Sequence, residues 1–260
     1  MNPASQQLRF LSALETHLDW FAARGQQVRL WWRDDDACTK TDKLDRLLGL
    51  SQRYRMPLAL AVIPSRLDKS LVQSLKGNKH VRVFQHGWDH KSYQRSLKGS
   101  KAAEFGSRRD LHDALLCLSH GRALLHFSFG SQFLPVLVPP WNRISPQIAR
   151  TLPEVGLDGL STFNWVNTLG ADQVQCHVDI IKWKKSQAFI GWHAAQKRFD
   201  LQLSRRRTNP LEPLGLLTHH LSHDDICFDF IQAFLSLTNR HKGACWPSFQ
   251  ELFPKVGPVT

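Results

Sequence analysis

The sequence predicts an α/β fold in which about seven parallel strands alternate with helices in a closed or nearly closed barrel. Continuous apolar runs such as residues 58–63 lack the alternation of a half-exposed strand and are typical of strands buried on both faces. Stretches with helical spacing separate these runs, which is the pattern of βα units. Polar clusters follow the strands, where parallel barrels carry their active sites.

The helices are predicted from apolar residues that recur at helical spacing. The N-terminal segment, residues 1–24, reads as an amphipathic helix through Leu8, Leu11, Leu14 and Leu18, and Gly25 ends it. The same spacing predicts helices over residues 41–55, 68–76, 100–126, 145–153 and 225–238.

The strands are predicted from short apolar stretches that end at prolines, glycines or polar clusters. They cover residues 28–32, 58–63, 81–84, 133–138, 157–160, 178–181 and 214–218. We expect one catalytic domain over residues 1–260, opened by the helix of residues 1–24.

Composition narrows the functional class. Hydrophobic residues make up 42% and charged residues 22%, which excludes a disordered or collagen-like chain. No apolar run approaches the ~18 residues that would span a bilayer, and Arg9, Glu15 and Asp19 leave no signal-peptide core, so a cytoplasmic location is expected. The net charge of +12 favours anionic partners, but the basic stretches carry no aromatics interleaved in a stacking pattern, so nucleic acid is not expected.

Five polar clusters come directly after predicted strands. Because parallel strands open on one face of a barrel, these clusters are expected on that face. They are Asp34–Asp36, His86–His90, Trp141–Arg143, Ser161–Thr162 and His219–His220.

A metal site is predicted from two of these clusters. His86 and His90 are spaced i, i+4, which on a tight turn directs both imidazoles to one divalent ion, although the same spacing also occurs in surface histidines. One aspartate completes a set of three ligands, for which zinc is the first choice. Side chains of consecutive strand residues alternate in direction, so Asp34, Asp35 and Asp36 cannot all face this ion.

These motifs resemble those of the polysaccharide deacetylases, carbohydrate esterase family 4, whose homology domain is a distorted (β/α) barrel. Arg33–Ala37, His86-x-x-x-His90, Val138–Trp141 and Leu216–His219 fall in the order of the family's motifs. The resemblance covers roughly residues 28–225. Ser161–Trp165 only hints at the family's fourth motif.

The resemblance implies a role for each matching position. Asp35 falls on the catalytic base, and Asp36, His86 and His90 fall on the metal ligands. The later motifs imply that the Trp141 backbone N–H serves the oxyanion, that Leu217 lines the acetyl pocket and that His219 is the acid, with His220 as the competing assignment. Val138 stands where the family has an arginine, so Arg143 or Arg33 is the candidate to supply that charge.

Three functions remain open at this point. The first is a metal-dependent hydrolase that deacetylates an N- or O-acetylated carbohydrate. The second is an amidohydrolase of a small non-carbohydrate amide on the same scaffold. The third is a non-catalytic barrel that binds anionic sugars through its basic surface, and the complete set of catalytic residue types argues against it.

Overall fold

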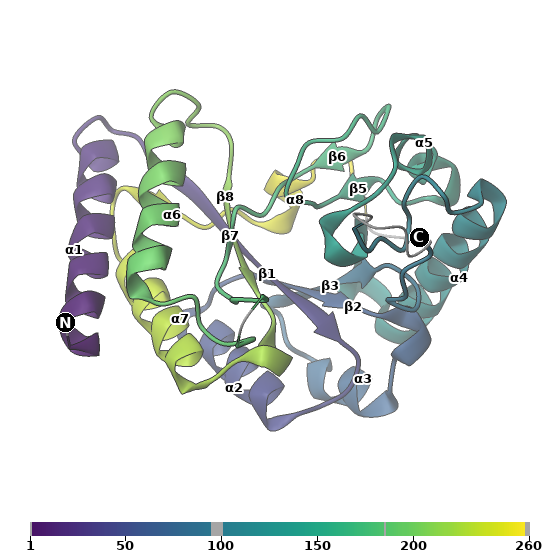
Figure 1. Cartoon of the computed structure of the whole chain (residues 1–260), viewed down its shortest axis with the longest axis horizontal. Coiled ribbons are helices and arrows are strands. Elements are labelled where there is room, and N and C mark those ends of the chain that lie inside the picture. The colour runs from purple at the N-terminus through teal and green to yellow at the C-terminus, as the bar shows by residue number, and fades with distance from the viewer. Residues whose placement is uncertain (1, 95–100, 185, 258–260) are drawn as a thin grey trace. The chain divides into compact units, whose positions relative to one another are not determined.

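Strand β1, Val28–Ala37, runs through two structural units of the chain. The computed structural model describes residues 2–94, 101–184 and 186–257. The first unit comprises Met1–Asp34, Thr41–Leu58 and Cys176–Ser248, and the second comprises Asp35–Lys40, Ala59–Gln175 and Phe249–Thr260. Figure 1 labels the elements of both units.

The first unit contains most of the long helices. Its helices are α1 (Pro3–Ala22), α2 (Asp42–Tyr54), α6 (Trp192–Arg206) and α7 (Asp225–Thr238), with the short turn η5 (His220–Ser222). Besides β1, its strands are β7 (Val178–Asp179), β8 (Leu214–Thr218) and β9 (Ala244–Cys245).

Strand β8 lies between β1 and β7 in this unit, and all three are parallel. The register pairs Leu30 with Leu214 and Asp34 with Thr218, which brings Asp34 beside the end of β8. Helices α1, α6 and α7 lie side by side (Figure 1). The Phe10 ring joins them, because its centroid lies 5.6 Å from that of Phe199 and 5.1 Å from that of Phe230.

The second unit carries the shorter strands and the loops that follow them. Its strands are β2 (Leu58–Val62), β3 (Val81–His86), β4 (Phe133–Val138), β5 (Gly159–Leu160) and β6 (Asp172–Gln173), together with the last residues of β1. Its helices are α3 (Lys69–Leu75), α4 (Leu111–Phe129), α5 (Pro146–Arg150) and α8 (Phe249–Leu252), with the turns η1 (Pro64–Arg66), η2 (Gly130–Gln132), η3 (Pro140–Asn142) and η4 (Leu152–Val155).

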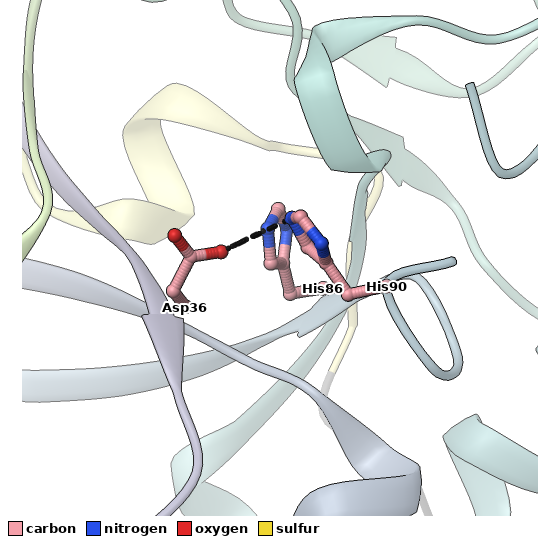
Figure 2. A group of neighbouring side chains, drawn as sticks. All are labelled: Asp36, His86 and His90. Carbon is pink, nitrogen blue, oxygen red and sulfur yellow. Dashed lines mark hydrogen bonds and ion pairs between the residues drawn. The ribbon is translucent and has the colours of Figure 1, made fainter. Parts of the chain in front are cut away.

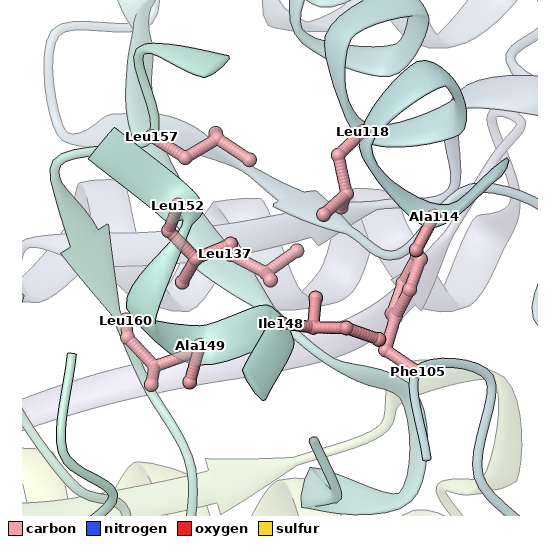
Figure 3. Packing of buried hydrophobic residues seen from close by; sticks show 9 residues of the cluster. All are labelled: Phe105, Ala114, Leu118, Leu137, Ile148, Ala149, Leu152, Leu157 and Leu160. Atoms are coloured by element: carbon pink, nitrogen blue, oxygen red, sulfur yellow. The ribbon is translucent and has the colours of Figure 1, made fainter. Parts of the chain in front are cut away.

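The strands of the second unit lie in the order β2-β3-β4-β5-β6, and the pairs from β3 to β6 are parallel. Carboxyl ends of parallel neighbours share one edge of a sheet, so the segments after His86, Val138 and Leu160 leave from the same edge. A buried hydrophobic cluster packs α4 and α5 against β4 and β5 (Figure 3). Its members are Phe105, Ala114, Leu118, Leu137, Ile148, Ala149, Leu152, Leu157 and Leu160.

The predicted parallel α/β organisation is confirmed in both units. Each of the seven predicted strands coincides with an observed strand, although β1 continues to Ala37, so the three aspartates belong to it. The predicted helix over residues 100–126 is wrong at its start, because the helix begins at Leu111 and residue 100 lies outside the described residues. Asp110 determines that start, since its carboxylate accepts the Asp113 N–H at 2.9 Å and caps the first turn.

Among the α-helices and strands of the described residues, four have no counterpart in the sequence prediction: α6, α8, β6 and β9. The prediction of a single domain over residues 1–260 stays a prediction. No helix within the described residues combines the length and apolarity that crossing a membrane requires.

Candidate metal centre

Three side chains of the second unit converge at the carboxyl ends of its strands (Figure 2). Asp36 lies at the end of β1, His86 ends β3, and His90 follows four residues later. Their ligand atoms all lie within 4.8 Å of one another. Asp36 Oδ1 is 3.1 Å from His86 Nε2 and 3.2 Å from His90 Nε2, so both imidazoles contact the same carboxylate oxygen.

The orientation of His86 is determined by a backbone carbonyl. Its Nδ1 lies 2.9 Å from the Val138 carbonyl oxygen, which can only accept, so Nδ1 carries the proton. In the neutral ring, Nε2 then carries a lone pair and no proton, and it lies 3.1 Å from Asp36 Oδ1. Two acceptors this close require either a second proton on the ring or a cation beside them. The donor set therefore fits a divalent metal, with two imidazole nitrogens and one carboxylate as ligands.

Backbone strain concentrates around this group. Seven non-glycine residues of the described chain have positive φ, and four of them lie in the last residues of β1 or in the loops that follow β3 and β4. They are Asp36 (71°), His90 (55°), Trp141 (56°) and Asn142 (55°). Such conformations cost on the order of 1–3 kcal/mol each and persist where the surroundings enforce them, which is typical of functional sites.

Three further predicted site residues, Trp141, Arg143 and Asp35, belong to the same unit as Asp36, His86 and His90. The Trp141 ring packs against His90, with centroids 4.5 Å apart. Arg143 donates to the Ala102 carbonyl at 2.7 Å, so its guanidinium braces the loop before α4. Asp35 is 1% exposed and belongs to the second unit with the metal ligands.

The loop between the two histidines is held by Glu104, which the sequence reading missed. This glutamate is 1% exposed and accepts backbone N–H groups of the loop, three in all. The pKa of Glu104 is raised to about 7, mainly by burial. The neighbouring Asp89 carboxylate adds to the rise, and the accepted N–H groups oppose it. A single glutamate in a loop belongs to no periodic pattern or spaced motif, so the sequence gives no sign of this role.

In the first unit, His219 lies beside Asp179. His219 Nδ1 is 3.8 Å from Asp179 Oδ1, and the Trp183 ring meets the imidazole edge-on at 4.6 Å. Asp179 is itself held, because it accepts the Ile181 N–H at 2.8 Å and the Trp183 indole N–H at 2.7 Å. Within the first unit, Asp179 and Trp183 thus accompany His219. Leu217, two residues earlier, is fully buried in β8.

His220 and Asp34 form a separate buried pair in the first unit. Asp34 accepts the Thr218 hydroxyl at 2.6 Å and the His220 backbone N–H at 2.9 Å, and the His220 ring also contacts it. Burial alone would raise the pKa of Asp34, but the His220 imidazole and these hydrogen bonds outweigh it and hold that pKa below its usual range. The structure thus pairs Asp34 with His220.

His223 is a third buried imidazole of the first unit. It is 2% exposed, and neither ring nitrogen has a hydrogen-bond partner among the residues that the structure describes. The edge of its ring packs on Phe228, with centroids 4.9 Å apart. Burial lowers the pKa of His223 to about 4, because a charged ring would be poorly solvated there.

No protein-family model matches the sequence, and no curated protein matches it. Solved structures do match the fold. A family 4 carbohydrate esterase from Streptomyces lividans in complex with acetate has a TM-score of 0.55 at 12% identity, covering 86% of this chain and 94% of that one. A family 4 acetyl xylan esterase from Clostridium thermocellum in complex with a cobalt ion has a TM-score of 0.51 at 13% identity, covering 87% and 90%.

A third structure with the same fold is a pseudoenzyme of carbohydrate esterase family 4 from Bacillus anthracis. Its TM-score is 0.57 at 10% identity, and the match covers 87% of this chain and 65% of that one. At these identities the likeness concerns the fold. The predicted fold, a distorted (β/α) barrel like that of the polysaccharide deacetylases, is confirmed.

Proposed function

Because the chain has the fold of the polysaccharide deacetylases, we propose that it is a metal-dependent hydrolase that removes acetyl groups from an N- or O-acetylated carbohydrate. It would then act on carbon–nitrogen bonds other than peptide bonds when the substrate is an N-acetyl sugar. The observation that supports this proposal most directly is the convergence of Asp36, His86 and His90 on one point. A cytoplasmic location stays a prediction from the sequence.

Asp36, His86 and His90 would hold one divalent ion, zinc by the chemistry of the donors. The acetyl xylan esterase with the same fold was solved with a cobalt ion, which suits the same kind of ligand set. When bound, such an ion polarises a carbonyl and lowers the pKa of a coordinated water toward ~7.

The remaining roles follow the resemblance. We assign the base to Asp35, which would accept the proton of the attacking water, and the acid to His219, which would protonate the leaving nitrogen. The Asp179 carboxylate lies beside the His219 imidazole, where it can orient the ring. His220 is the weaker assignment, because it is fully buried against Asp34.

The acetyl group would be recognised by three further residues of the motifs. Trp141 supports the substrate groove through its ring, and its backbone N–H is assigned to the developing oxyanion. Leu217 is assigned to the acetyl pocket. Arg143 is assigned to the charge that the family's third-motif arginine supplies, although its guanidinium is also engaged with the Ala102 carbonyl.

Two other functions remain as outcomes of the test. One is hydrolysis of a small non-carbohydrate amide on the same scaffold. The other is sugar binding without catalysis, which the existence of a pseudoenzyme with this fold keeps in view. The +12 charge would in either case favour a substrate or ligand with anionic groups.

The first experiment measures the metal content of the purified protein by elemental analysis. We expect about one zinc per chain in the wild type, and a marked loss in His90→Ala because one of three protein ligands is removed. His112→Ala is the matched control, since His112 is an exposed histidine of the same unit. Equal zinc in the wild type and His90→Ala would refute the ligand assignment.

The second experiment measures acetate release from acetylated sugars and product release from small amides. Release from the sugars alone supports the proposed function, and release from the small amides alone supports the amidohydrolase. A protein that binds stoichiometric zinc and turns over neither group would support the non-catalytic alternative.

A further inference from the structure

The backbone of the loop from His86 to His90 donates to a single side chain. The Trp88 and Asp89 N–H groups both donate to Glu104 Oε1 at 2.9 Å, and the His90 N–H donates to Glu104 Oε2 at 3.2 Å. Three consecutive amides therefore converge on one buried carboxylate. The loop is therefore bound through three successive residues at both oxygens of one side chain.

The carbonyl groups of the same loop are also bound. The Ser65 N–H donates to the Trp88 carbonyl at 3.0 Å, and the Arg66 guanidinium donates to the Asp89 carbonyl at 2.8 Å. The Gln85 amide donates to the Gly87 carbonyl at 3.1 Å. With both sides of the loop engaged, its path is defined by specific partners.

The carboxylate reaches the loop only because residue 87 is glycine. A Cβ there would lie 2.2 Å from Glu104 Oε2 and 2.7 Å from Pro140 Cδ, and Gly87 itself has a φ of 60°. At the far end of the loop, His90 has a φ of 55°, a backbone conformation that is unfavourable for any residue with a Cβ. The hydrogen bond from the His90 N–H to Glu104 Oε2 helps to hold the backbone of His90 in this conformation.

Glu104 is held rigidly by its own neighbours. Phe105 is fully buried in the core cluster of Figure 3, and its carbonyl accepts the Ser145 N–H at 2.7 Å. The preceding Ala103 carbonyl accepts the Tyr93 N–H at 3.1 Å, which ties this segment to the chain just beyond His90. Displacing the carboxylate would require moving a packed phenylalanine.

We propose that Glu104 is a positioning residue of the metal centre: its carboxylate fixes the backbone at His90 and thereby aims the His90 imidazole at Asp36 and His86. This role rests on the proposed function, because it concerns the metal that these three residues would hold. Groups behind metal ligands typically change metal affinity 10–100-fold when they are altered.

Glu104→Gln is the sharpest variant because it preserves the shape of the side chain. The amide retains one acceptor oxygen, so at least one of the three N–H groups faces an NH₂ donor instead. If the oxygen keeps the position of Oε1, the N–H that loses its acceptor is that of His90. We expect a 10–100-fold weaker affinity for zinc, measured by competition with a chromogenic chelator. Glu154→Gln, an exposed glutamate of the same unit, is the matched control and should bind zinc like the wild type.

A cobalt-substituted sample provides the readout that a merely structural role would not change. The visible absorption bands of Co²⁺ report the arrangement of its ligands, so a displaced His90 alters their shape and position. A variant that is only less stable would show the wild-type bands at lower intensity. If Glu104→Gln does not fold, Glu104→Asp replaces it, since it keeps two acceptor oxygens but withdraws them by one methylene.

The outcomes separate the two proposals. A wild type that binds no zinc refutes the proposed metal centre and the role of Glu104 within it. A wild type that binds zinc, with Glu104→Gln equal to it in affinity and in Co²⁺ bands, overturns the role of Glu104 alone. Weaker binding with altered bands, alongside an unchanged Glu154→Gln, supports it.

Discussion

Replacing His223 with leucine should make the stability of the protein less dependent on pH. The imidazole is buried without a hydrogen-bond partner, and burial lowers its pKa to about 4 from an ordinary value of 6.5. The Asp34 and Asp224 carboxylates favour the charged ring, whereas His219 and His220 oppose it. Leucine has a similar volume and no charge, so the substitution itself should change stability by less than about 1.5 kcal/mol at neutral pH.

The sign follows from which state takes up the proton. Above pH 6.5 the ring is neutral in both states, and its contribution to the unfolding free energy is complete. Between 6.5 and 4 only the unfolded chain binds the proton, so stability falls by about 1.4 kcal/mol per pH unit as the pH decreases. Below 4 both states are protonated and the loss levels off. Between pH 7.5 and 4.5 the ring should therefore remove about 2.5 kcal/mol of stability.

Urea unfolding at pH 7.5 and 4.5 measures this difference, with circular dichroism and tryptophan fluorescence as two probes and a chelator present to exclude metal binding. His177, whose pKa is also lowered to about 4, acts in the same direction, but it does so in the wild type and the variant alike. The exposed His112→Leu should behave like the wild type. If His223→Leu loses as much stability as the wild type over this range, the burial argument is wrong.

Three further substitutions test the candidate site. His219→Ala should lower the rate of amide deacetylation by about 10²–10⁴-fold, and less for an ester with a good leaving group; a loss of that size in folded His220→Ala, with His219→Ala near the wild type, would move the acid to His220. Asp35→Asn should abolish acetate release while zinc stays bound, whereas Asp36→Asn should lower the zinc content; the opposite pattern would exchange the two roles. Gly87→Ala should destabilise the protein by about 1–3 kcal/mol, because its Cβ would lie 2.2 Å from a carboxylate oxygen and 2.7 Å from a proline ring; an unchanged thermal midpoint would contradict that clash.

The strands were predictable because their apolar runs are buried on both faces. Residues 58–62 and 133–138 are strands of the second unit, and the continuous apolar pattern is the direct record of that burial. Helix α6 carried a usable signal, since Trp192, Ala195 and Phe199 recur at helical spacing on its buried face. Its many charged residues concealed that spacing.

The convergence of Asp36, His86 and His90 was predictable for a different reason, namely the fixed spacing and order of these residues along the chain. Glu104 and Asp179 were not, because each is a single acidic residue whose role depends on what folding brings beside it. Asp179 has a tryptophan four residues after it in the sequence, and the indole N–H of this residue, Trp183, donates to its carboxylate.

The carbonyl that orients His86 belongs to the main chain of Val138, and the two residues are paired in the register of β3 and β4. Every amino acid carries that carbonyl, so the tautomer of His86 is independent of the side chain at position 138. A mutational scan of this position would therefore leave the imidazole oriented while changing volume and charge around it. Sliding β4 by one residue would do the reverse, because successive carbonyls along a strand point in opposite directions. The alignment of two strands thus decides which nitrogen of this histidine is available as a ligand.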